Sequence, residues 1–222
     1  MSMLTPLLRA NPASPRLTVY DETGGTRMEF SAQTLDNWAA KVANMLDEEF
    51  DLAPDSRVLV DVPVSWQAAV IAIGTCTASR SPELGDVEPS GQPGVVFTTP
   101  ERASAWESVP DVVVVSPDPF GRGVVESGGE LPIGTIDFGP TVRFYGDDYF
   151  GNSPELARWA RDGVGAGRWR VGPWRDTRGF EDSVLAPLAA GGSVVVVTGL
   201  ASAERLAAID AAENVTGTLP AE

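Results

Sequence analysis

The sequence predicts an α/β fold in which helices flank a largely parallel sheet and an N-terminal β-hairpin forms an antiparallel margin. Runs of β-branched residues alternate with stretches of helical periodicity, an order typical of β-α-β units. The run at 111–115 (DVVVV) is continuously apolar, as parallel strands buried on both faces tend to be. The 222 residues fit a single α/β domain spanning 1–222, or two packed subdomains at 1–85 and 86–222.

The N-terminal quarter predicts a hairpin followed by a helix. Residues 17–21 (LTVYD) and 26–30 (TRMEF) flank the turn sequence Glu22-Thr23-Gly24-Gly25. Ser31 is placed to cap a helix that ends near Phe50. Apolar residues recur on one face of that helix, at Leu35, Trp38, Ala39, Val42, Met45 and Leu46.

The middle of the chain predicts two further groups of elements. A strand at 57–62 precedes a helix over 66–78, which is apolar nearly all round and therefore expected to be buried. The polar, Pro- and Gly-rich stretch 79–93 is a natural subdomain boundary. Beyond it we expect a strand at 94–98, a helix from Pro100, the strand at 111–115 and a strand at 141–145 (TVRFY).

The remaining chain predicts alternating helices and strands. Ser153 should begin a helix that ends at Gly163, and a Trp/Arg-rich segment follows. The last elements expected are a helical stretch around 180–190, a strand at 193–198, a helix at 202–213 and a short strand at 215–219.

The residue types that the chain lacks limit the reactions that it could catalyse. The chain has no histidine, one cysteine (Cys76) and one lysine (Lys41). The usual general base at neutral pH and the commonest metal ligand are therefore missing. Serine hydrolysis lacks both histidine and a G-x-S-x-G motif. We assign no catalytic residue, no metal ligands and no cofactor.

Charge and hydropathy bear on partners and location. A formal charge of -15 opposes binding to nucleic acid and to anionic membranes, because both present phosphates. No apolar run approaches the roughly 20 residues of a membrane span, and Pro6 interrupts the only apolar patch at the N-terminus. The prediction is a cytoplasmic protein with neither a nucleic-acid nor a membrane partner.

Several short motifs occur in a specific order. They are MEFS at 28–31, PDSRV at 54–58, DVPVS at 61–65, LAPLAAGGSVVV at 185–196 and ENVT at 213–216. Together they resemble the acyl-adenylate-forming (AMP-binding) enzyme superfamily. The resemblance implies a truncated, degenerate relative of that superfamily's N-terminal large domain, with the same α/β fold.

The resemblance also implies a Ser/Thr/Gly-rich phosphate loop ending in lysine, expected after the strand at 141–145. The residues found there are Tyr145, Gly146, Asp147 and Asp148, with two carboxylates where phosphate would sit. These four are the candidate ligand-binding residues. The catalytic lysine of the superfamily's C-terminal domain has no counterpart, since Lys41 lies on the first long helix.

Two local signals have a functional and a structural interpretation. Gly163-Val164-Gly165-Ala166-Gly167 follows a predicted helix, so a helix C-cap with a flexible turn is favoured over a nucleotide loop. The cluster at 168–178 (RWRVGPWRDTR) could bind an anion or stack a base. A half-exposed strand with packed tryptophans and acid-paired arginines is favoured. For Asp147-Asp148 a solvated acidic turn is favoured over a magnesium site.

Three hypotheses for function stay open. The leading one is a non-catalytic relative of AMP-binding acyl ligases that binds an acyl or nucleotide ligand or has a regulatory role. The second is a self-associating interaction protein, a homo-oligomer without a retained pocket. The third is part of a ligase completed in trans by a partner. A binder predicts an open cleft near 144–150, whereas an interaction protein predicts a filled cleft and an exposed apolar patch elsewhere.

Overall fold

The computed structural model describes residues 2–50, 52–53, 55–85 and 93–220. The chain forms two compact units that interleave along the sequence. Unit 1 consists mostly of Asp36–Pro63 and Gln67–Ser153, and unit 2 mostly of Met3–Leu35 and Pro154–Glu222. The subdomain boundary predicted between residues 85 and 86 adjoins the stretch 86–92, which lies outside the described residues. That boundary stays a prediction.

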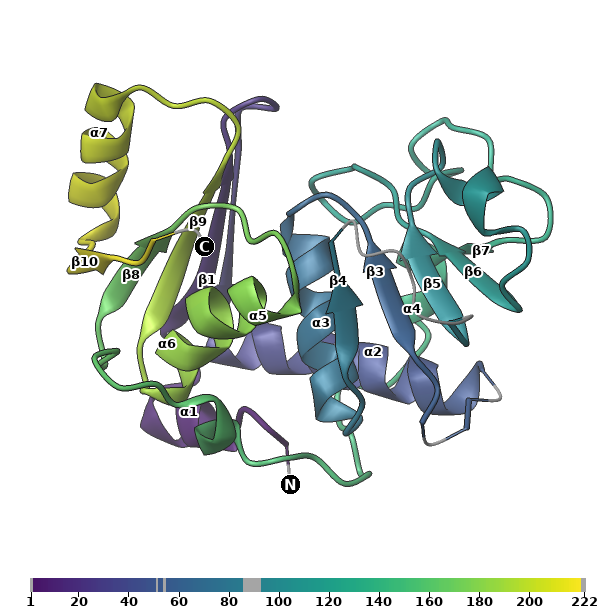
Figure 1. Ribbon diagram of the computed structural model, residues 1–222, viewed down its shortest axis with the longest axis horizontal. Coiled ribbons are helices and arrows are strands. Elements are labelled where there is room, and N and C mark those ends of the chain that lie inside the picture. The colour runs from purple at the N-terminus through teal and green to yellow at the C-terminus, as the bar shows by residue number, and fades with distance from the viewer. Residues whose placement is uncertain (1, 51, 54, 86–92, 221–222) are drawn as a thin grey trace. The chain divides into compact units, whose positions relative to one another are not determined.

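Unit 1 contains a five-stranded sheet in the order β4-β3-β5-β6-β7, parallel at every pairing (Figure 1). Its strands are β3 (Val58–Asp61), β4 (Pro82–Leu84), β5 (Val95–Thr98), β6 (Asp111–Val114) and β7 (Ile136–Asp137). The chain passes from β3 to β4 on one side and then resumes with β5 on the other. This reversal is typical of doubly wound α/β sheets.

Helices of unit 1 cover this sheet. They are the α2 helix (Ala32–Glu48) from residue 36 onward, α3 (Trp66–Thr77) from residue 67, the short 3₁₀ helix η1 (Ala103–Trp106) and α4 (Phe138–Val142). A buried cluster joins β3, β5 and β6 to η1 and the following loops, through Leu59, Val96, Ala103, Val109, Val112, Val114 and Val124. The core of unit 1 therefore lies along its parallel strands.

Unit 2 contains the second sheet, in the order β10-β8-β9-β1-β2. Its strands are β1 (Pro15–Asp21), β2 (Thr26–Ser31), β8 (Arg168–Val171), β9 (Ser193–Thr198) and β10 (Gly217–Thr218). Only the β1–β2 pairing is antiparallel, which confirms the N-terminal hairpin as the margin of a parallel sheet.

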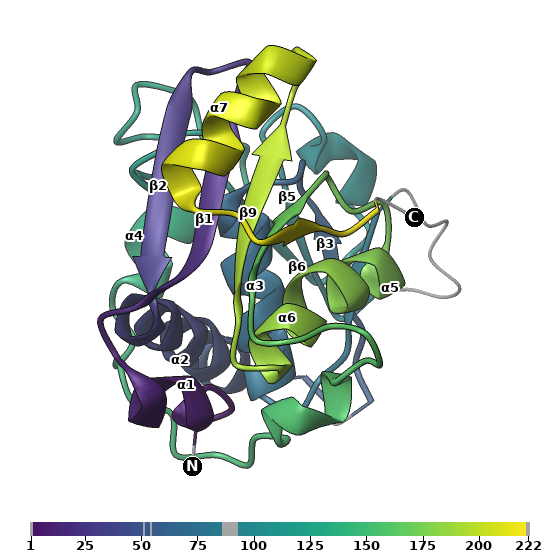
Figure 2. The ribbon, with the colours of Figure 1, turned by 90° about the vertical axis from the view of Figure 1, so that its left-hand side faces the viewer.

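The last helix covers one face of this second sheet. The α7 helix (Ala203–Glu213) packs Ile209 against Tyr20, Val195 and Val197 of β1 and β9, and Figure 2 shows it lying across these strands. Ser202 caps its first turn by accepting the N–H of Arg205. The other helices of unit 2 are α1 (Thr5–Ala10), η2 (Leu156–Trp159), α5 (Thr177–Phe180), the π-helix η3 (Glu181–Leu185) and α6 (Ala186–Ala189).

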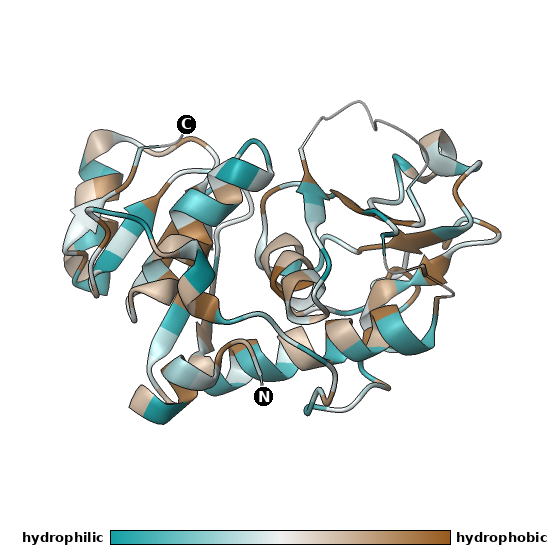
Figure 3. Cartoon of the chain, turned by 60° about the horizontal axis from the view of Figure 1, so that its bottom comes forward, coloured by the Kyte–Doolittle hydropathy of each residue, from teal (hydrophilic) through white to brown (hydrophobic). Residues whose placement is uncertain are grey.

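The predicted α/β class with parallel strands and flanking helices is confirmed, with the strands divided between two sheets. The predicted cap of α2 is also found, since Ser31 Oγ accepts the N–H of Thr34 at 3.2 Å. In Figure 3 several strands of unit 1 are largely brown, whereas the strands of unit 2 and the helices carry both colours. Within the described residues no helix has the length and apolar character needed to cross a bilayer.

The strand predicted at 141–145 is wrong. Residues 138–142 form the α4 helix, and the edge position beside β6 belongs to Ile136–Asp137. The alternation TVRFY imitates a half-buried strand, but Arg143 instead binds Glu126 and Phe144 is exposed. The edge position of the sheet is occupied by β7, whose two residues are too few to show a periodic pattern in the sequence.

Two helices are shorter than predicted, and two elements besides β7 and α4 were not foreseen. The regions from Pro100 and from Ser153 form only the single 3₁₀ turns η1 and η2. The β4 strand lies within the polar stretch 79–93, and α1 precedes the hairpin. Elements of this length have too few residues for a hydrophobic period to emerge.

Candidate functional site

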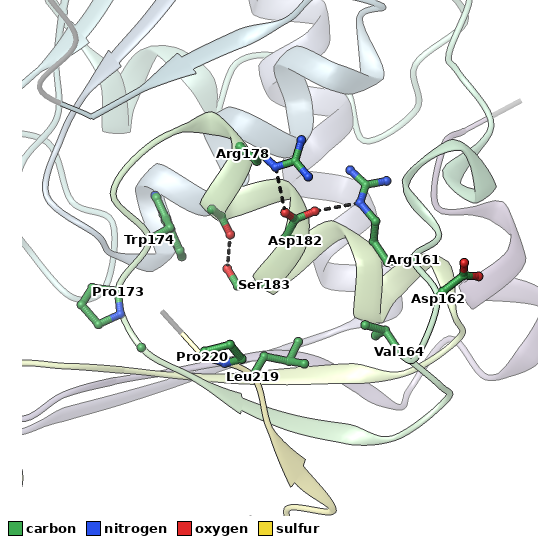
Figure 4. Close-up of a pocket in the computed structure, with 12 residues that line it drawn as sticks. Arg161, Asp162, Val164, Pro173, Trp174, Arg178, Asp182, Ser183, Leu219 and Pro220 are labelled. Carbon is green, nitrogen blue, oxygen red and sulfur yellow. Dashed lines mark hydrogen bonds and ion pairs between the residues drawn. The ribbon is translucent and has the colours of Figure 1, made fainter. Parts of the chain in front are cut away.

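A cavity of about 400 Å³ lies within unit 2. Its walls come from the segment after η2, the α5 helix with the π-helix, and the chain end after β10 (Figure 4). The lining residues are Arg161, Asp162, Val164, Gly172, Pro173, Trp174, Arg178, Gly179, Asp182, Ser183, Leu219 and Pro220. This volume lies in the range of small-molecule sites, which run from roughly 300 to 1,000 Å³.

The local sequence explains the shape of one wall. Asp176 caps α5 by accepting the N–H of Gly179 at 2.8 Å. The helix then widens into a π-turn over Glu181–Leu185. Such turns are rare in proteins overall, but many of those known lie at functional sites. Ser183 Oγ donates to the carbonyl of Gly179 at 2.6 Å, so its hydroxyl is held by the helix itself.

Trp174 forms the apolar floor, and Phe180 packs behind it. Trp174 is buried and packs edge-on against Phe180, with ring centroids 5.1 Å apart. Val164, Leu219 and the two prolines add further apolar surface. An apolar ligand portion would therefore be desolvated here.

Charged groups gather on one side of the cavity, and Figure 4 shows two guanidinium groups converging on Asp182. Arg161 Nε donates to Asp182 Oδ1 at 2.8 Å, and Arg178 Nε lies 3.3 Å from Asp182 Oδ2. Arg178 is 78% exposed. The cavity thus combines an apolar interior with a polar rim, which suits an amphipathic small molecule.

The four residues predicted to bind a ligand lie in unit 1, against the α2 helix. Lys41 Nζ donates to the carbonyl of Tyr145 at 2.6 Å and forms an ion pair with Asp147 at 2.9 Å. The Asn44 side-chain amide donates to the carbonyls of Gly146 and Asp148 at 3.2 and 3.0 Å. None of these four residues belongs to the lining of the unit 2 cavity or of a second cavity in unit 1. Their role in ligand binding stays a prediction.

Tyrosines at both ends of this turn donate to carboxylates in the last turn of α2 and just after it. The Tyr149 hydroxyl donates to Asp47 at 2.7 Å, and the Tyr145 hydroxyl donates to Glu49. Burial and these acceptors raise the pKa of both tyrosines. The turn and helix are rich in carboxylates, which disfavours a phosphate there. Among the described residues, no group of three or more acidic or cysteine side chains could hold a metal ion.

Comparison with known proteins identifies the chain's relatives. No family model matches it. The TIGR03089 family protein of Mycobacterium tuberculosis is 34% identical, and the match covers 88% of each chain. This chain belongs to the TIGR03089 family.

Solved structures show the same fold as this TIGR03089 family member. They include an acyl-CoA synthetase of Brucella canis (TM-score 0.71, 16% identity) and the acetoacetyl-CoA synthetase of Streptomyces lividans (TM-score 0.74, 16% identity). An anthranilate CoA ligase in complex with anthranoyl-AMP also matches (TM-score 0.66, 12% identity). These matches cover 98–99% of this chain but only 47%, 42% and 49% of the respective synthetases. The chain therefore spans less than half the length of these enzymes.

The Trp/Arg-rich cluster of this family member has the structural character that was favoured, and its role in binding an anion or a base stays a prediction. Arg168 pairs with Glu213, and Arg170 Nε lies 2.6 Å from Asp210, so β8 is the half-exposed, acid-paired strand that was favoured. Trp174 and Arg178, further along, line the cavity. Sequence reasoning singled out both, but missed Arg161 and Leu219, which are remote in sequence.

The glycine-rich segment at 163–167 is a turn before β8. Gly163 has φ +82°, and the Gly165 carbonyl accepts the indole N–H of Trp169 at 3.0 Å. This segment follows a 3₁₀ turn and leads into a strand, opposite to the strand-to-helix order of a phosphate loop. The favoured turn interpretation agrees with these contacts, although no long helix precedes it.

A second cavity, of about 510 Å³, lies in unit 1 beyond the carboxyl ends of β5 and β6. Its charged lining residues are all acidic: Glu101, Asp118 and Glu130. Asp118 is engaged by Arg122 and by the N–H groups of Phe120 and Arg122. The cavity in unit 2 offers the stronger combination of buried aromatic surface and charged groups of both signs.

Proposed function

We propose that this chain is a non-catalytic, truncated relative of acyl-adenylate-forming enzymes that binds an acyl-type small molecule in the cavity of unit 2. One observation carries the proposal: an apolar cavity of about 400 Å³ with buried Trp174 and with Arg161 and Arg178 at its rim. The apolar wall suits an acyl or aryl chain, and the guanidinium groups suit its carboxylate. The shared fold with acyl-CoA synthetases supports the same class of ligand.

The non-catalytic part of the proposal rests on the available side chains. The chain has no histidine, and its sole lysine is engaged by Asp147 and by the Tyr145 carbonyl. The Ser183 hydroxyl, the one hydroxyl in the cavity lining, donates its proton to the backbone carbonyl of Gly179 and is therefore not directed at a carboxylate base. This arrangement can hold a ligand but offers neither a histidine nor a lysine for proton transfer, and Asp182, one of its two carboxylates, is paired with arginines.

The direct test is calorimetric and thermal-shift titration with octanoate, hydrocinnamate, AMP, Mg-ATP and a non-hydrolysable acyl-adenylate analogue. Saturation at about 100 times the dissociation constant should add about 2.7 kcal/mol, a shift of roughly 5–10 °C. We expect this shift with the acyl ligands and no ATP–pyrophosphate exchange. Flat curves for every compound would overturn the proposal, and exchange activity would revive a ligase.

An occluding variant assigns the site. Val164→Trp should fill part of the cavity and abolish the shift, because Val164 is half-buried in its wall. Val125→Trp is the matched control, since Val125 is 62% exposed in unit 1 and outside the cavity. Equal loss of binding in both variants would place the ligand elsewhere.

A specific observation also favours a second function, that of a self-associating interaction protein. Large apolar side chains are exposed, among them Phe120, Ile133, Phe144, Phe150 and Leu200. Sedimentation velocity over a wide concentration range tests this alternative. A monomer at every concentration would exclude self-association, whereas a dimer would support it independently of ligand binding.

A further inference from the structure

Asp182 stands between the two arginines of the unit 2 cavity. Each of its carboxylate oxygens faces a different guanidinium group: Oδ1 faces Arg161 Nε at 2.8 Å and Oδ2 faces Arg178 Nε at 3.3 Å. The three side chains come from separate places, namely the segment after η2, the α5 helix and the π-helix (Figure 4). The carboxylate of Asp182 thus occupies the position between the two guanidinium groups that an anionic ligand would bind.

The two ion pairs differ in how firmly they hold their arginine. Arg161 is 34% exposed and also lies 3.7 Å from Glu181. Arg178 is 78% exposed, and its separation from Asp182 exceeds the usual length of a charge-assisted hydrogen bond, about 2.7–2.9 Å. An incoming anion can therefore replace Asp182 as the partner of Arg178 more readily than as the partner of Arg161.

We infer that Asp182 acts as a built-in competitor that sets the charge selectivity of this cavity, an inference that rests on the proposed function. A ligand carboxylate that binds the arginines competes with Asp182 for their guanidinium groups, and Asp182 repels it at close range. A neutral ligand of the same shape meets neither obstacle. The intact protein therefore binds an acyl carboxylate and its neutral amide with similar affinity, and removal of the Asp182 charge favours the carboxylate alone.

The test compares Asp182→Asn with a matched control, Asp162→Asn. Both variants remove one carboxylate from the cavity lining, but only Asp182 binds the two arginines. Hydrocinnamate and hydrocinnamamide, which share their shape, are titrated calorimetrically into each protein at low salt. Asp182→Asn should bind the carboxylate at least about tenfold more tightly and change the amide affinity less than about twofold. Asp162→Asn should leave the ratio of the two affinities within about threefold of wild type.

A double variant shows whether the gain comes from the released guanidinium group. In Asp182→Asn combined with Arg178→Gln, the preference for the carboxylate should fall back toward that of wild type. The ratio of two affinities within one protein does not depend on the stability of that variant. If Asp182→Asn fails to fold, Asp182→Ser replaces it with the same expected ratio.

The outcomes separate the inference from the proposed function. Equal changes for carboxylate and amide in Asp182→Asn would overturn the inference and leave an acyl site in place. A wild-type protein that already prefers the carboxylate more than tenfold would also overturn it. Failure of both probes to bind to wild type and to Asp182→Asn would overturn the inference and the proposed function together.

Discussion

Glu213, the last residue of α7, accepts a hydrogen bond from the hydroxyl of Tyr20 on β1 at 2.6 Å. The same carboxylate oxygen accepts from Arg27 Nε at 2.7 Å, and the other binds Arg168 of β8. The Glu213 side chain is only 5% exposed. One buried acid thereby joins the hairpin, β8 and the last helix of unit 2.

Replacing this acid should destabilise unit 2. In Glu213→Gln the partly buried Arg168 and Arg27 lose the buried carboxylate that they share and keep only the more exposed Glu29, so we expect the free energy of unfolding to fall by about 2–4 kcal/mol. Urea unfolding followed by circular dichroism measures it. Glu204→Gln removes an exposed acid from the same helix and should cost less than about 0.5 kcal/mol. Equal losses in the two variants would show that the network contributes nothing specific.

The same network predicts a pH dependence. Burial alone would raise the pKa of Glu213, but hydrogen bonds from Arg27, Tyr20 and Arg168 outweigh it and lower the pKa from 4.5 to about 2. The folded state therefore binds fewer protons at this group than the unfolded state. Its stabilisation is complete above the unfolded pKa and is lost as pH falls from about 4.5 toward 2. The stability difference between wild type and Glu213→Gln, measured from about pH 6 to pH 3, should shrink with acidification. A constant difference would contradict this.

Gly74 allows two helices of unit 1 to approach closely. A Cβ built on Gly74 of α3 would lie 2.4 Å from Cβ of Val42 on α2, far inside van der Waals contact. Gly74→Ala should lower the free energy of unfolding by about 1–3 kcal/mol, despite the higher helix propensity of alanine. Gly165→Ala is the control, because no atom lies within 4 Å of its added methyl group. A lower unfolding temperature for Gly165→Ala than for Gly74→Ala would contradict the close packing at Gly74.

Lys41 should order the turn at 145–148. Its ammonium group holds the Tyr145 carbonyl and Asp147, and the Lys41 side chain is 21% exposed. In Lys41→Gln we expect amide hydrogen exchange in this turn to accelerate by about tenfold, since roughly 1.4 kcal/mol of local stability is lost. Asp147→Asn keeps the bond to the carbonyl and should have a smaller effect. Unchanged exchange in Lys41→Gln would mean that Asn44 and the two tyrosine hydroxyls hold the turn without Lys41.

Local signals predicted the elements that carry them in consecutive residues. The hairpin has a Gly-Gly turn between two short runs of alternating residues, and α2 has a serine cap and a long apolar stripe. The strand predicted at 141–145 failed because alternation over five residues fits both an edge strand and the end of a short helix. Its neighbours decided the outcome, since Asp137 accepts the N–H groups of Val124 and Val125 and so fixes β7 beside β6.

The candidate site was only half visible in the sequence. Trp174 and Arg178 lie in a cluster that stands out in an acidic chain, so an anion-binding role could be considered from composition alone. That Asp182 neutralises Arg178 follows from helical spacing, because the two are four residues apart. That Arg161 joins them, and that Leu219 closes the opposite wall, depends on contacts between distant segments.

The sequence by itself determined the α/β class, the hairpin margin and the absence of histidine, because these depend on composition and on periodicity within single segments. Tertiary structure alone decided that the strands divide into two sheets, that the turn at 145–148 is held by α2, and that a cavity opens beside Trp174. These features arise from pairing and packing between residues far apart in the chain, and such contacts leave no period or motif in any one segment.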